Sequence, residues 1–109
     1  RTISIDKVKN KIVGQDKLMQ KSIKSRIKYD VRFHLYPGLT AVQTLGGSNL
    51  LIQINKNKAL LFSTNEKSLK IEKSIFFGGQ KVLDNYCIVI SGIMENNEKI
   101  INWEIVKKI

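Results

Sequence analysis

Apolar and polar residues alternate without a break over residues 29–36. This period of two is typical of a β-strand with one buried face and one polar face, and Pro37 and Gly38 end it. The buried side would carry Tyr29, Val31, Phe33 and Leu35, and the polar side Asp30, Arg32, His34 and Tyr36. Because the polar side holds the only histidine of the chain, it is the first place to look for chemistry.

Further short strands are predicted along the chain, each bounded by turn residues. They cover residues 1–5, 39–45, 50–54, 59–64, 69–77, 86–93 and 101–105. Residues 86–93 are apolar on both sides of the strand, which favours a central strand covered on two faces. Turns are expected at residues 6–11, 14–16, 46–47, 55–58, 78–79 and 94–99.

Residues 17–28 are ambiguous. Met19, Ile23 and Ile27 recur every four positions, which permits a short amphipathic helix with lysines on its exposed side. A polar loop with occasional apolar anchors fits the same residues. Neither alternative assigns a function to this stretch.

About eight or nine short strands, separated by hairpin-sized connections and without a long helix, predict an all-β fold. We expect an antiparallel β-sandwich with mostly meander connections. At 109 residues, the chain should form one domain over residues 1–109. It starts with a strand pattern at Arg1 rather than with methionine, so we expect it to be a fragment of a longer chain.

The chain has a net charge of +10, and residues 1–28 carry nine basic and two acidic groups. An anionic partner would therefore meet the N-terminal quarter. However, the basic residues are 16 Lys and 3 Arg, whereas phosphate and base recognition favours arginine. Residues 17–28 also lack the interleaved aromatic residues that stack on bases. We expect no nucleic-acid partner, and no membrane partner because no apolar run approaches about 20 residues.

The sequence offers few catalytic arrangements. One histidine, one cysteine and nine scattered carboxylates cannot supply a zinc site, and no calcium-binding loop occurs. His34 is the only candidate base for a nucleophile, and Asp30 lies about 13 Å away along the same strand, too far to orient the imidazole directly. No catalytic residue and no metal ligand is therefore assigned.

The polar face itself has two interpretations. Arg32, His34 and Tyr36 either form a solvated or interdomain sheet surface, or they form a wall beside a saccharide site. In the second case Arg32 would bind carboxylate or sulfate, and the other two would offer donors and a stacking face. Trp103 alternates with isoleucines, which favours core packing over a sugar platform. Cys87 is expected to be a small buried apolar residue.

Five motifs then occur in one order along nearly the whole chain. They are residues 1–6 (RTISID), 14–18 (GQDKL), 32–37 (RFHLYP), 72–76 (EKSIF) and 102–104 (NWE). With this series the chain resembles the C-terminal part of heparinase II/III-like proteins, which are bacterial polysaccharide lyases and their relatives. The RFHLxP segment is the most specific motif. The chain departs from the resemblance at Tyr36, where relatives often carry a second histidine, and at Leu61, where they often carry tryptophan.

The resemblance implies a large enzyme in which an α/α toroid precedes β-sandwich domains. Such enzymes cleave uronic-acid-containing polysaccharide by β-elimination, with a base that removes the proton next to the carboxylate and an acid, often tyrosine, that assists the leaving oxygen. Those groups and any metal ligands would lie upstream, so we expect this segment to hold no cofactor and to be supporting rather than catalytic. The implied partners are the upstream toroid and β domains of the same chain and acidic polysaccharide, in a periplasmic location.

Two alternatives remain open at this point. The chain could be a self-contained module that binds an anionic glycan through residues 17–28 and the Arg32 face. It could also be a basic β domain that binds nucleic acid, which would show an affinity that falls steeply with salt.

Overall fold

The computed structural model describes residues 1–20, 26–44, 49–79 and 81–108. These residues form nine strands, and none of them lies in a helix. The strands are β1 (Thr2–Asp6), β2 (Lys11–Met19), β3 (Ile27–His34), β4 (Thr40–Gln43), β5 (Asn49–Gln53), β6 (Ala59–Thr64), β7 (Ser68–Gly78), β8 (Lys81–Met94) and β9 (Glu98–Lys108). The described part of the chain accordingly contains no helix long and apolar enough to cross a membrane.

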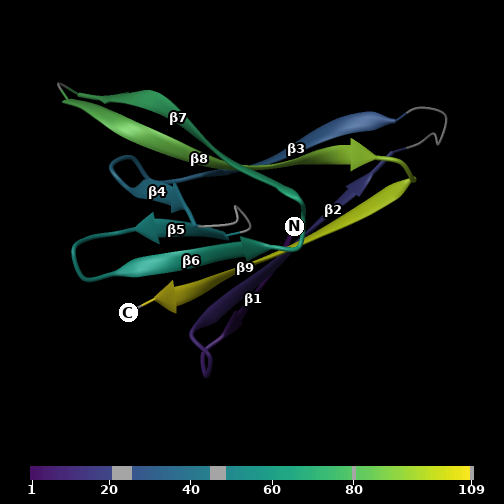
Figure 1. The fold of residues 1–109 in the computed structure, drawn as a ribbon, viewed down its shortest axis with the longest axis horizontal. Helices are drawn as coiled ribbons and strands as arrows, with labels where there is room; N and C mark the ends of the chain where they lie inside the picture. The colour runs from purple at the N-terminus through teal and green to yellow at the C-terminus, as the bar shows by residue number, and fades with distance from the viewer. Residues whose placement is uncertain (21–25, 45–48, 80, 109) are drawn as a thin grey trace.

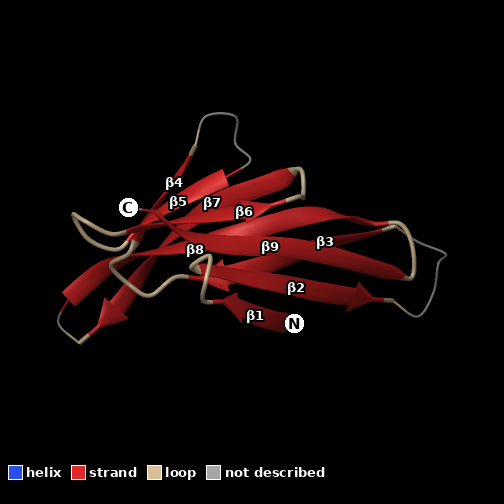
Figure 2. Cartoon of the chain, turned by 90° about the horizontal axis from the view of Figure 1, so that it is seen from below, coloured by secondary structure: helices blue, strands red, loops and turns tan. Residues whose placement is uncertain are grey.

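The strands form two antiparallel sheets that pack face to face (Figure 1). One sheet has six strands in the order β1-β2-β9-β6-β5-β4, and the other has three in the order β3-β8-β7. Figure 2 shows the same strands from below, with β1 at one margin of the large sheet. The predicted all-β antiparallel sandwich is confirmed.

Strand pairing combines hairpins with longer connections. Neighbours in sequence pair in the β1–β2, β4–β5–β6 and β7–β8 hairpins, as a meander predicts. The remaining pairings are β2 with β9, β6 with β9 and β3 with β8, which join distant parts of the chain. The long strand β9 therefore joins β2 to β6 within the large sheet, and β8 joins β3 to β7 within the small one.

The core lies where the two sheets meet. Its buried members come from β3, β5, β6, β7, β8 and β9, and the most buried are Leu50, Phe62, Ile88, Ile90 and Ile101. Burying one such side chain contributes about 1.5–3 kcal/mol. An aromatic cluster joins the sheets, because the Phe33 ring lies 5.1 Å from that of Phe62 and 5.0 Å from that of Trp103. The prediction that Trp103 is a core residue is confirmed.

The turn predicted at residues 14–16 is wrong, because β2 runs through it. Gly14 pairs with Trp103 across the β2–β9 ladder, and a Cβ atom at Gly14 would lie 2.0 Å from Cζ2 of the indole ring. The glycine therefore makes room for an aromatic ring and does not turn the chain. Asp16 is buried, and it accepts hydrogen bonds from the Arg1 guanidinium at 2.7 and 3.1 Å.

The helix alternative for residues 17–28 is wrong wherever the structure describes them. Lys17–Met19 end β2 and pair with β9, while Ile27 and Lys28 begin β3 and pair with β8. Cross-strand pairing outweighs the helical spacing of the apolar residues here. Residues 21–25 and the expected turn at residues 46–47 lie outside the described residues.

Candidate functional site

The predicted polar face lies on the outer surface of the three-stranded sheet. Within the sheet, Arg32 is opposite Val89, while His34 and Glu72 flank Cys87 on either side. Side chains that are neighbours on one face of adjacent strands lie about 5 Å apart, so these residues form a continuous patch. A shallow depression of about 510 Å³ opens over it and is lined by Arg32, His34, Glu72, Lys73 and Cys87.

Two carboxylates bind the Arg32 guanidinium. One of its amino groups donates to Glu72 on β7, and the other lies 3.4 Å from an oxygen of Asp30 on its own strand. Asp30 is itself held by the Ser91 hydroxyl, which donates to it at 2.8 Å. Hydrogen bonding to Glu72, and then to Cys87, raises the pKa of Arg32 above its ordinary value. The arginine is thus fixed across the sheet, and its charge is balanced without any ligand.

The ion pair covers an apolar strip along β8. Cys87 and Val89 point to the outer face of the sheet, yet they are only 6% and 2% exposed. The prediction that Cys87 is buried is confirmed. The aliphatic stem of Arg32 and its partner Glu72 flank this strip, which is a common role for long charged side chains.

His34 and Tyr36 occupy different positions. His34 ends β3 and lines the depression beside Arg32. It makes no hydrogen bond or ion pair within the described part of the chain. Tyr36 lies past the end of the strand, in a turn closed by the Leu39 amide, which donates to the Tyr36 carbonyl at 3.2 Å, and the tyrosine is 78% exposed. The structure therefore brings Arg32 and His34 together and leaves Tyr36 outside the depression.

Three residues of the depression were not assigned to it from the sequence. Glu72, Lys73 and Cys87 come from β7 and β8, far from β3 along the chain. Only the alternation of residues 69–77, which places Glu72 on the polar side, pointed toward one of them. The pairing of β3 with β8 could not be read from the alternation alone.

The basic N-terminal quarter is partly neutralised. The structure describes seven of its nine basic residues. Four of these seven form ion pairs, which are Arg1 with Asp16, Lys11 with Glu104, Lys17 with Glu98, and Arg26 with Glu95. The three pairs other than Arg1 with Asp16 are partly exposed, and exposed pairs contribute at most about 1 kcal/mol each to stability. They nevertheless place negative charge beside the cations, which weakens the positive potential that would attract a polyanion.

The described residues gather no group of three or more His, Cys, Asp or Glu side chains that could hold a metal ion. Among the described residues that line the depression, the only carboxylate is that of Glu72, and it is paired with Arg32. His34 has no carboxylate among its described contacts to orient its imidazole. This arrangement can bind or support a neighbour, but it presents no paired acid and base.

These features define the chain as an antiparallel β-sandwich of two sheets with a polar outer face. The family model described as Heparinase II/III-like, C-terminal, matches residues 1–104. The chain therefore belongs to the heparinase II/III-like family, a family of polysaccharide lyases, and represents its C-terminal region. The resemblance found in the sequence motifs is confirmed. No match was found among curated proteins or among solved structures.

Proposed function

We propose that this chain is a supporting, non-catalytic β-sandwich of a polysaccharide lyase. It would act beside catalytic domains of the same polypeptide, on an acidic polysaccharide. The observation that carries the proposal is the state of the polar depression. There Arg32 is already neutralised by Glu72 and Asp30, and His34 has no orienting partner among the described residues. Elimination next to a uronate needs a base and an acid placed around one sugar ring.

In this proposal the outer face of the three-stranded sheet flanks the substrate site of a neighbouring domain. Arg32 and His34 would form the wall, and Tyr36 would extend it from the adjoining turn. Glu72 and Asp30 hold the guanidinium in one place, which suits a positioning role. Because these carboxylates already balance the charge of Arg32, the face by itself attracts an anionic glycan only weakly, which disfavours the alternative of a stand-alone glycan-binding module.

Incubation of the chain with uronic-acid polysaccharides tests the proposal. Lyase products contain an unsaturated uronate that absorbs ultraviolet light, and we expect no increase in that absorbance. Far-UV circular dichroism of the same sample should show a β-rich spectrum, which establishes that the inactive protein is folded. Absorbance that appears with the purified chain and is lost in His34→Ala would overturn the supporting role.

A further inference from the structure

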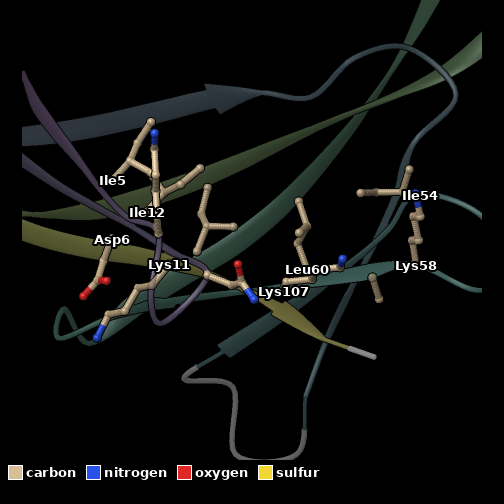
Figure 3. A pocket seen from close by; sticks show the side chains of 12 residues that line it. Ile5, Asp6, Lys11, Ile12, Ile54, Lys58, Leu60 and Lys107 are labelled. Carbon is tan, nitrogen blue, oxygen red and sulfur yellow. The ribbon is translucent and has the colours of Figure 1, made fainter.

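A second concave surface lies on the inner face of the large sheet, and it shares no lining residue with the polar depression. It has a volume of about 470 Å³ and opens where the β1–β2 turn, the β5–β6 turn and the end of β9 meet. Its floor consists of Ile5, Ile12, Ile54, Leu60 and Ile105. Figure 3 shows Ile5 and Ile12 on one side of it, Ile54 and Lys58 on the other, and Leu60 between them. We call this surface the lysine-rimmed groove.

The floor of the groove continues the hydrophobic core. Ile12, Leu60 and Ile105 are partly buried and pack against the core cluster. Ile5 and Ile54 extend the same apolar surface outward, and they are 70% and 42% exposed. A sheet of three strands does not cover the whole inner face of a sheet of six. An apolar surface that joins the core and ends in solvent is typical of an interaction site.

The rim is positively charged. Lys7, Lys58 and Lys107 come from the β1–β2 turn, the β5–β6 turn and β9, and their side chains form no ion pair with any described residue. Among the described lining residues only Asp6 is acidic, and one of its carboxylate oxygens accepts hydrogen bonds from the amides of Val8 and Lys9. The rim therefore offers three separated cations around an aliphatic floor.

We infer that the lysine-rimmed groove is the docking site for an acidic polypeptide segment that carries aliphatic side chains. Three lysines on three different elements match several carboxylates better than the single head group of an amphiphile. The described lining residues include no aromatic ring on which a sugar could stack, which disfavours a glycan. A second copy of the chain would bring the same +10 charge to the rim, which disfavours self-association.

Fluorescence anisotropy with labelled synthetic peptides tests the inference on the intact chain. The probe is a short peptide of alternating glutamate and leucine, and the comparison peptide replaces each leucine by serine. We expect the leucine peptide to bind about tenfold more tightly or better, which is the order expected for a buried aliphatic contact. Equal affinity of the two peptides, or no binding of the leucine peptide, would overturn the inference.

Substitutions then locate the binding surface. Ile5→Glu should weaken the leucine peptide about tenfold or more, whereas Val42→Glu, on the exposed side of β4 and equally apolar, should leave it unchanged. Lys58→Glu combined with Lys107→Glu should weaken binding and flatten its salt dependence, because rim charges act mainly through long-range attraction. Lys108→Glu makes the same change of charge as Lys107→Glu alone, at the next strand position but outside the groove, and should weaken binding less than Lys107→Glu does.

Three results would contradict this assignment. They are binding that Ile5→Glu leaves intact, a sulfated oligosaccharide that displaces the peptide, and a chain dimer in sedimentation that Ile5→Glu dissolves. Circular dichroism of each variant establishes folding before its affinity is compared. Ile5 is mostly exposed, so its substitution should leave the core intact.

Discussion

Gly14 and Gly92 each lie beneath an aromatic ring of the paired strand. The register places Gly14 opposite Trp103 and Gly92 opposite Tyr29. A glycine in a strand loses conformational freedom without gaining a packed side chain, and a ring folded over it recovers apolar contact. At these two positions the glycine and the aromatic residue therefore act as one unit.

Gly14→Ala should destabilise the protein by about 1–3 kcal/mol, the usual cost of overpacking a core. The added Cβ would lie 2.0 Å from Cζ2 of Trp103, and the indole is fixed between Phe33 and Phe62. Urea unfolding followed by circular dichroism measures the change. Gly92→Ala is the matched control, with a smaller expected cost, because Tyr29 is only partly buried at the margin of the core, whereas Trp103 is a buried member of it. Equal midpoints for Gly14→Ala and the parent chain would refute the steric argument.

At the scale of elements, a polar contact joins the two sheets. Tyr29 on β3 donates a hydrogen bond of 2.8 Å to Glu66 in the β6–β7 turn, and the Lys99 ammonium on β9 lies 3.2 Å from the same carboxylate oxygen. Burial, then the hydrogen bond to Glu66 and its negative charge, raises the pKa of Tyr29 from 10.0 to about 12. The folded state thus favours the neutral phenol.

The sign of the resulting pH dependence follows from linkage. A raised pKa in the folded state means that the contribution of Tyr29 is complete below pH 10 and is lost as the pH rises from 10 through about 12. The difference in unfolding free energy between the parent chain and Tyr29→Phe should therefore shrink over this range. Because lysines titrate in the same range, the difference between the two proteins is the informative quantity. Tyr36→Phe removes an exposed hydroxyl and should show no such trend; a constant difference for Tyr29→Phe would exclude the linkage.

Across the whole molecule, the strands that could be predicted from the sequence are those set by the local alternation of apolar and polar residues. Residues 59–64 were predicted as a strand and form β6 with the same bounds. The failure at residues 14–16 has a tertiary cause, because Gly14 accommodates an indole and Asp16 pairs with Arg1. The residues of the candidate site likewise divide into those that the local sequence places and those that only the strand order brings in. Arg32 and His34 share a strand and could be predicted, whereas Glu72 and Cys87 reach the depression only through the order β3-β8-β7.

One core shared by both sheets should make the chain unfold as a single unit. Ile88 belongs to the small sheet and Ile101 to the large one, and both are almost fully buried in the same cluster. Ile88→Val and Ile101→Val should each cost about 0.5–1.5 kcal/mol. Each variant should shift the urea midpoints of Trp103 fluorescence and far-UV circular dichroism together, since coincident probes indicate two-state unfolding. The chain has one tryptophan, and it lies between the sheets, so its fluorescence reports their separation. If Ile88→Val moved the dichroism transition alone, the three-stranded sheet would be unfolding independently of the large sheet.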